Sequence, residues 1–202
     1  MAKIENFFLV SLLIAISLLV FILVNDAGKN IITGFSSFGT ATTSVNLLEI
    51  ASVAITGNID FGAGRVDVTA INATLDSDEA TVAGGTWNAS LLPQYIKVEN
   101  DGTVNISVNV SADGNNNAQG FIGGTSPLFQ IKGKETEPGA CVTLQTTYAN
   151  VPNSTETPLA ICDLLQYVNS ADEFNVSAKL VIPSDAAPGQ RNVTLTFSVS
   201  KV

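Results

Sequence analysis

The chain repeats one pattern along most of its length: apolar and polar residues alternate in short stretches that turn-forming residues separate. In 103–110, four Val or Ile residues alternate with Asn and Ser, which is typical of a strand with one buried face. The stretches of this kind are 52–56, 65–71, 95–100, 103–110, 128–132, 141–145, 174–182 and 192–199. About eight short strands with Gly, Asn, Asp or Pro between them predict an all-β fold, an Ig-like or jelly-roll β-sandwich, over residues 45–202.

One stretch departs from the alternation and predicts a short helix. Thr157 and Pro158 are typical of a helix N-cap followed by proline at the first helical position. The apolar residues that follow share one face of such a helix: Ile161, Cys162, Leu165 and Val168. We therefore expect one short helix to pack its apolar face on the sandwich.

The chain contains two cysteines, Cys141 and Cys162. They form one disulfide if the chain is exported, or remain two buried thiols if it is not. A bond would fix the predicted helix to the strand at 141–145, and closing a loop of this size stabilises a fold by about 3 kcal/mol. The compartment therefore decides their chemistry.

An uncharged apolar run at residues 7–24 indicates the compartment. As a helix it spans roughly 27 Å, close to the thickness of the hydrocarbon layer of a membrane. Because the residues after it offer a poor cleavage site, residues 1–24 predict a retained membrane anchor, with a cleaved signal or a buried core helix as alternatives. Residues 25–44 are rich in Gly, Ser, Thr and Asn and predict a flexible linker. We expect the sandwich on the outer side of the cell membrane.

Seven N-x-S/T tripeptides follow this run, and each has the acceptor pattern for N-linked sugar. They are about twice as frequent as the composition predicts. Four of them lie on the polar phase of a predicted strand, where a sugar leaves the core undisturbed, although any polar residue would take that phase. The predicted glycosylation sites are Asn72, Asn88, Asn105, Asn109, Asn153, Asn175 and Asn192.

Composition argues against several functions. The chain has no histidine, which removes the Ser-His-Asp and Cys-His catalytic arrangements and His-ligated metals. Its net charge of -9 and the lack of a basic patch in the sequence argue against a nucleic-acid partner. We therefore assign no catalytic residue, metal ligand or cofactor, and expect a protein that is not an enzyme.

Three further patterns in the sequence each have a functional and a structural interpretation. The run DGNNN at 113–117 resembles the start of a calcium loop, but Ala118 and Gly124 replace the expected Gly and Glu, so a turn is favoured. The acidic stretch LDSDEA at 75–80, with Asp76, Asp78 and Glu79, is interpreted as a solvated turn. Four aromatic residues suit either a sugar-stacking platform or the core, and the core is favoured. They are Trp87, Tyr95, Tyr148 and Tyr167.

Three short motifs carry a resemblance to known proteins: IDFG at 59–62, VENDGT at 98–103 and VIPSDAAPGQ at 181–190. With the N-terminal apolar run, they resemble secreted archaeal β-sandwich surface proteins and, more loosely, camelysin/TasA-type subunits of biofilm filaments and bundling pili. Glu5 ahead of the apolar run is weakly similar to type IV pilins. The resemblance implies a structural role in which a strand of one subunit completes the sheet of the next. The candidate donor is 45–56, although a retained anchor departs from that pattern.

Two functional hypotheses result. The first is a structural cell-surface protein, a subunit of an extracellular filament, pilus or envelope layer that self-associates into a homopolymer and is assembled through its N-terminal segment. Its N-terminal helix would contact the membrane or pack in the filament core. The alternative is a membrane-tethered monomeric binding module, either an adhesin or a carbohydrate-binding domain.

Overall fold

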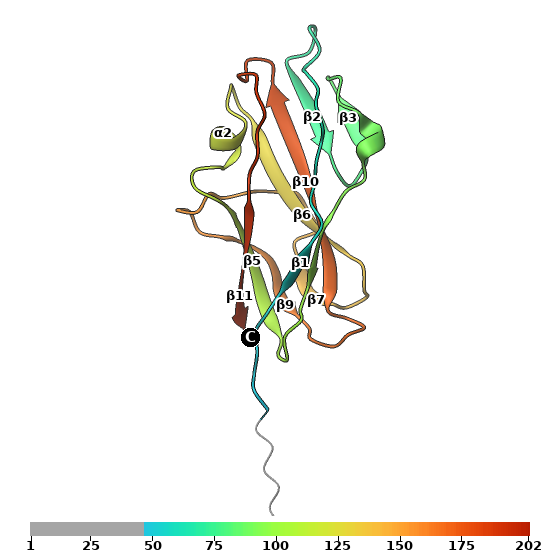
Figure 1. Ribbon diagram of the computed structural model, residues 1–202, viewed down its shortest axis with the longest axis vertical. Helices are drawn as coiled ribbons and strands as arrows, with labels where there is room; N and C mark the ends of the chain where they lie inside the picture. Colours follow the sequence, from blue (N-terminus) through green and yellow to red (C-terminus); the bar gives the residue numbers. More distant parts are fainter. Residues whose placement is uncertain (1–46) are drawn as a thin grey trace, which may run out of the picture. The chain divides into compact units, whose positions relative to one another are not determined.

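The computed structural model describes residues 47–202, which form two antiparallel sheets facing each other (Figure 1). The larger sheet contains β1 (Ala54–Thr56), β2 (Asn72–Asp76), β3 (Thr81–Ala83), β4 (Ile96–Glu99), β6 (Leu128–Glu135), β8 (Ala149–Asn150) and β10 (Glu173–Pro183). The smaller sheet has the order β11 (Leu195–Lys201), β5 (Ile106–Ala112), β9 (Leu159–Leu165) and β7 (Cys141–Leu144). A 3-10 turn at Ala89–Leu91 and the short helix α2 (Ala118–Phe121) complete the elements. The predicted all-β fold is confirmed.

The first segments of the chain lie outside the described residues. These are the predicted membrane helix at 1–24, the predicted linker at 25–44 and the first two residues of the predicted sandwich. Among residues 47–202, no helix has the length and hydrophobicity needed to cross a membrane.

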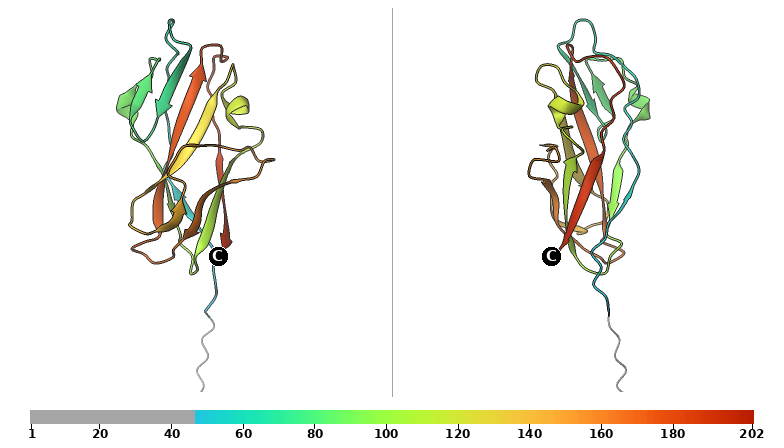
Figure 2. Two further views of the ribbon diagram at one scale, coloured as in Figure 1. Left: turned by 180° about the vertical axis from the view of Figure 1, so that it is seen from behind. Right: turned by 60° about the vertical axis from the view of Figure 1, so that its left-hand side comes forward.

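Strand β10 organises the larger sheet (Figure 2). Along one side it pairs with β6 over Phe174–Val181. Along the other side its first part pairs with β4 and its second part with β2. Strand β10 can do this because its 11 residues alternate almost throughout, so that Phe174, Val176, Ala178 and Leu180 all turn into the core.

The core lies between β10 and the strands beside it in the larger sheet and β5 and β9 in the smaller sheet. Ile106, Val108 and Val110 of β5 are fully buried, as the alternation in 103–110 predicts. Complete burial of a side chain of this size stabilises the fold by about 1.5–3 kcal/mol. The hydrophobic effect therefore fixes which face of β5 turns inward.

The helix predicted after Thr157 is wrong, since Leu159–Leu165 is strand β9. The pairing of β9 with β5 is irregular: Val108 lies opposite Cys162, whereas the next residue, Asn109, lies opposite Ala160. Because of this irregularity, Ile161 and Cys162 are both buried although they are consecutive residues. Together with the buried Leu165, these two residues have the spacing of one face of a helix. This spacing explains why the sequence predicted a helix here.

The strand predicted at 65–71 is also absent from the structure at these residues, where only Val66 forms a single bridge, to Gly85. Val68 and Ile71 are almost fully exposed. The hairpin forms directly afterwards instead, with β2 and β3 on either side of residues 77–80. Two backbone hydrogen bonds flank this bridge, from the Asp67 N–H to the Gly84 carbonyl and from the Thr86 N–H to the Arg65 carbonyl. The alternation at 65–71 therefore gives one bridge beside the end of β3 and not a full strand.

Candidate functional site

The two long sides of the sandwich differ. On one side the sheets are joined, because the Gly133 N–H of β6 donates to the Gln145 carbonyl just after β7 (2.7 Å). Leu144 packs directly on Gly133, where a Cβ atom would come within 2.5 Å of its side chain. On the other side β11 is the edge of the smaller sheet, and β1 and β3 are edge strands of the larger sheet. Within the described part of the chain, β11 pairs only with β5 and β1 only with β4. The sandwich is therefore closed along β6 and β7 and open along β11 and β1.

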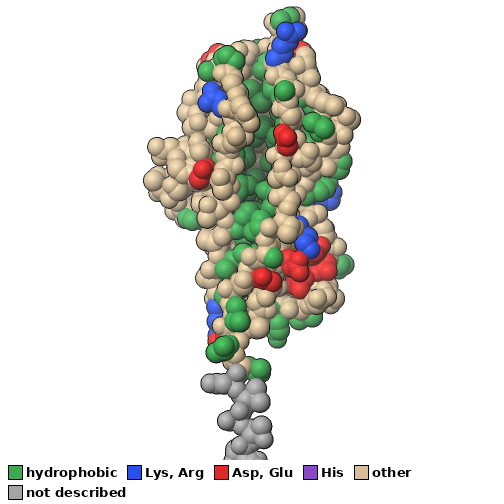
Figure 3. All heavy atoms as spheres, in the orientation of Figure 1, with side chains coloured by type: hydrophobic (Ala, Val, Ile, Leu, Met, Phe, Trp, Pro, Cys, Tyr) green, Lys and Arg blue, Asp and Glu red, His purple; other side chains and the backbone are tan. Residues whose placement is uncertain are grey.

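The open side exposes apolar surface, which we call the seam. It is bordered by Ile59 and Phe61 from the segment after β1, and by Leu195, Phe197 and Val199 of β11, all of which are only partly buried against the core. The space-filling view shows apolar side chains along a furrow on this face (Figure 3). Ile59 and Phe61 belong to the IDFG motif, so one of the motifs that carry the family resemblance borders the seam.

The outer edge of β11 carries backbone groups that can bind another strand. The Asp113 N–H donates to the Thr194 carbonyl, and the Val202 N–H donates to the Asn105 carbonyl. Thr194 and Val202, at the two ends of β11, therefore turn their backbone groups toward β5. Because the direction alternates along an antiparallel strand, Leu195, Phe197 and Val199 turn their N–H and C=O groups away from β5. Such an unpaired edge is a template for strand addition.

The chain enters the sandwich beside the end of β11. Ile50 exchanges hydrogen bonds with Thr103, and Glu49 forms an ion pair with Lys201 at the end of β11. Leu47 and Leu48 are 86% and 75% exposed, so this part of the predicted donor stretch is unburied. The later part, Ala54–Thr56, already pairs with β4 of its own chain as β1.

Cys141 and Cys162 form a disulfide, with their Cα atoms 5.9 Å apart. The bond joins the neighbouring strands β7 and β9, where the sequence led us to expect a strand and a helix. A disulfide is compatible with an extracellular location, where such bonds persist.

A cluster of charged and aromatic residues covers the outer face of the larger sheet, where the sequence predicted a solvated turn. Asp78 binds two lysines, Lys132 (2.9 Å) and Lys134 (2.8 Å), and accepts a hydrogen bond from the Tyr95 hydroxyl (3.1 Å). Burial alone raises the pKa of Asp78, but the hydrogen bonds from Lys134, Lys132 and Tyr95 outweigh it and lower the pKa to about 2. The solvated-turn interpretation is therefore wrong for this residue.

The neighbouring Asp76 is buried, with 1% of its surface exposed. It accepts a hydrogen bond from the Tyr148 hydroxyl (2.5 Å) and lies 3.7 Å from Lys179. Burial and the Asp76 carboxylate raise the pKa of Tyr148 far above its usual value, so this hydroxyl stays protonated and remains a donor. The lysines and tyrosines of this cluster are spread over 95–179, and no sequence spacing brings them together.

The aromatic residues divide between environments. Trp87 packs against the core, where it lies over Gly64 and Gly85, as the sequence predicted. Tyr95 and Tyr148 instead belong to the charged cluster, and Tyr167 is half exposed. They therefore form no common stacking platform.

The predicted glycosylation sites differ in exposure. Asn72, Asn88 and Asn192 are exposed, and Asn105, Asn109 and Asn175 are partly exposed. Asn153 is 9% exposed, and its Oδ1 accepts hydrogen bonds from the Thr155 N–H (2.9 Å) and hydroxyl (2.8 Å). Sugar on Asn153 would require this turn to open.

The stretch at 113–117 forms a capped turn. Asp113 accepts hydrogen bonds from the Asn116 side chain (2.9 Å) and the Thr194 N–H (3.1 Å), which lower its pKa. Asn117 caps α2 by accepting from the Gly120 N–H (3.3 Å). Over residues 47–202, no group of three or more His, Cys, Asp or Glu side chains is placed to hold a metal ion.

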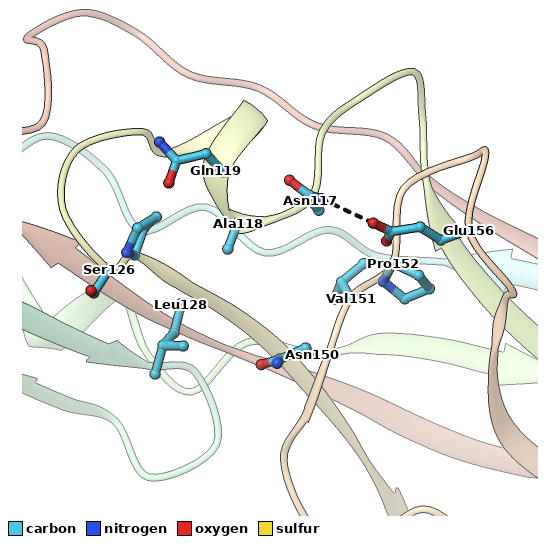
Figure 4. A pocket seen from close by; sticks show the side chains of 10 residues that line it. Asn117, Ala118, Gln119, Ser126, Leu128, Asn150, Val151, Pro152 and Glu156 are labelled. Carbon is cyan, nitrogen blue, oxygen red and sulfur yellow. Dashed lines mark hydrogen bonds between the residues drawn. The ribbon is translucent and has the colours of Figure 1, made fainter.

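A shallow pocket of about 440 Å³ lies beside α2 (Figure 4). Asn117 and Glu156 meet in its wall through a 3.3 Å hydrogen bond, and Asn150 lies on the opposite strand β8. Amide and carboxylate groups with small apolar neighbours suit a neutral polar ligand.

The fold and these features define an antiparallel β-sandwich with one disulfide, one closed side and one open side. Comparison with known proteins adds no closer assignment, since no protein-family model matches the chain and no curated protein matches it.

Proposed function

We propose that this protein is a structural subunit of an extracellular filament, in which an extended segment of one copy fills the seam of the next. The observation that carries the proposal is the open side of the sandwich, where the unpaired edge of β11 lies beside partly buried apolar residues. A strand added there satisfies backbone N–H and C=O groups and buries apolar side chains in the same step.

The donor that fits best is the segment ahead of β1, around residues 45–53. Its side chains Leu47, Leu48 and Ile50 are exposed in the single chain. Extended residues place alternate side chains on one face, so this segment can present apolar groups to a seam. Its described part, 47–53, lies at the end of the sandwich where β11 ends, which suits a head-to-tail arrangement of copies.

Other features support a surface location for this subunit. The disulfide suits an oxidising compartment, and the exposed sequons suit sugar attachment on the outer surface. The apolar run at 7–24 supplies attachment to the membrane or packing within the filament. As part of this proposal, the sandwich is of the Ig-like or jelly-roll type. The proposal also includes a relationship to archaeal surface proteins and, more loosely, to camelysin/TasA-type subunits.

Substitution at Val199 tests the proposal. In Val199→Pro the outward N–H of the edge is lost while the bonds of β11 to β5 remain, so we expect the full chain to fold and stop forming polymers. The matched control is Val199→Ala, which keeps the N–H and shortens the side chain. Electron microscopy and light scattering of native full-length protein give the readout. Unchanged polymers of Val199→Pro would show that β11 is not the acceptor.

The pocket beside α2 favours a second candidate, a monomeric module that binds a neutral sugar. Titration of the full chain with neutral oligosaccharides, followed by calorimetry, tests it. Saturable binding that Asn150→Ala abolishes and the exposed control Asn115→Ala retains would support this function, whereas absence of binding would reject it.

A further inference from the structure

The two oxygens of the buried Asp76 carboxyl group have unlike surroundings. Oδ1 accepts three hydrogen bonds, from the Tyr148 hydroxyl (2.5 Å), the Asp78 N–H (3.0 Å) and the Glu79 N–H (3.2 Å). Oδ2 is buried and has no hydrogen-bond partner among the residues that the structure describes. The Lys179 ammonium lies 3.7 Å from Oδ2, which is beyond hydrogen-bond distance.

This arrangement is unusual for an ion pair. Buried polar atoms are nearly always hydrogen-bonded, because an unpaired one costs free energy. A second buried atom without a partner, Oγ of Ser177, lies two residues before Lys179 on the same face of β10. Within the described part of the chain, these two are the buried side-chain polar atoms that have no hydrogen-bond partner.

The same arrangement is suited to acyl transfer. Lys179 and Asp76 are directly opposite each other on β10 and β2, so the two strands hold an amine beside a carboxyl carbon. The three donors surround Oδ1, the oxygen on which negative charge develops when a nucleophile attacks that carbon. Tyr148 remains a donor because its pKa is raised, and its ring lies 5.2 Å from the Lys179 nitrogen.

We propose that Lys179 and Asp76 form an intramolecular amide bond that joins β10 to β2. Starting from ammonium and carboxylate, Nζ forms a bond to Cγ and the bond from Cγ to Oδ2 breaks. Oδ2 leaves as water with two of the ammonium protons, and the third proton stays on the amide nitrogen. Nothing is oxidised or reduced, and no further reactant is needed.

The neighbouring lysines are internal comparisons. Both oxygens of Asp78 accept from lysine ammonium groups, Oδ1 from Lys134 and Oδ2 from Lys132. Neither oxygen of Asp78 is without a partner, in contrast to Oδ2 of Asp76. The amide bond is therefore specific to Asp76 and Lys179, and it stands independently of whether the protein forms filaments.

Mass spectrometry of the full chain, produced in cells without N-glycosylation, tests the bond. We expect an intact mass lower by one water than the mass of the disulfide-bonded sequence. Digestion should release a branched peptide joined at Asp76 and Lys179. A full mass with two separate peptides would overturn the proposal and leave an ion pair only.

Three variants make the test specific. Lys179→Arg keeps the positive charge but removes the nucleophilic amine, so it should restore the full mass. The matched control Lys132→Arg, in the same cluster, should still lose one water. Loss of water from Lys179→Arg would place the reaction elsewhere and contradict the assignment. Tyr148→Phe removes one donor to Oδ1 and should slow the appearance of the branched peptide in freshly made protein, and an unchanged rate would contradict the role given to Oδ1.

Discussion

Asp78 shows how single residues stabilise the outer face of the larger sheet. Its carboxylate connects Lys132 and Lys134 of β6 to the turn after β2. Its pKa in the folded protein, about 2, lies below the ordinary value of 3.8. A depressed carboxyl pKa stabilises the fold above the unfolded pKa, and this contribution is lost as the pH falls through the folded pKa.

Asp78→Asn therefore has a predictable pH dependence. We expect the variant to lose about 1–2 kcal/mol of unfolding free energy at pH 7, because the amide cannot pair with the two ammonium groups. The difference from the unaltered protein should shrink between about pH 4 and pH 2. Denaturant unfolding across this range measures it, with the exposed neighbour Glu79→Gln as control. A difference that does not depend on pH would contradict the explanation.

Glycosylation is predicted to follow exposure. Asn72, Asn88 and Asn192 are exposed on the surface, although Asn88 accepts hydrogen bonds from Ser90, whereas Asn153 is 9% exposed and held within its own turn. Glycopeptide mass spectrometry of native protein should find sugar at the first three and none at Asn153. Sugar at Asn153 with the exposed sites bare would contradict this, and an intact mass without any sugar would reject surface glycosylation altogether.

Strands β9 and β11 show which secondary-structure elements the sequence pattern predicts correctly and which it does not. The alternation in β5, β10 and β11 predicted these strands because one face of each is largely apolar. It failed for β9, where the irregular pairing with β5 places adjacent residues in the core. It also failed for the charged cluster, because Asp78 and Lys134 are 56 residues apart and meet only when β2 and β6 flank β10. Local pattern predicts faces of strands, whereas contacts between strands depend on topology.

The disulfide acts between two elements, β7 and β9. Replacing both cysteines, Cys141→Ala with Cys162→Ala, should lower the free energy of unfolding by about 3 kcal/mol, since the unfolded chain regains the freedom of the closed loop. Removal of the buried Cys162 sulfur adds to this loss. Denaturant unfolding of the variant, compared with the unaltered protein under reducing conditions, measures the effect. Equal stability of the variant, the reduced protein and the disulfide-bonded protein would mean that the bond does not stabilise the fold.

The whole molecule is a sandwich with unequal sides. Its closed side is fixed by the contact between Gly133 and Gln145 and lies near the disulfide. Its open side offers the β11 edge and apolar side chains, and the exposed segment ahead of β1 begins at the same end of the sandwich. A body that carries both an acceptor edge and a segment able to fill it suits assembly of identical copies in one direction.

Cryo-electron microscopy of native protein recovered from cells tests this account most directly. We predict a regular polymer in which density for an extended segment of a neighbouring copy runs along β11, over Phe197 and Val199. Monomers, or a polymer in which the β11 edge is free and copies meet through another face, would contradict it.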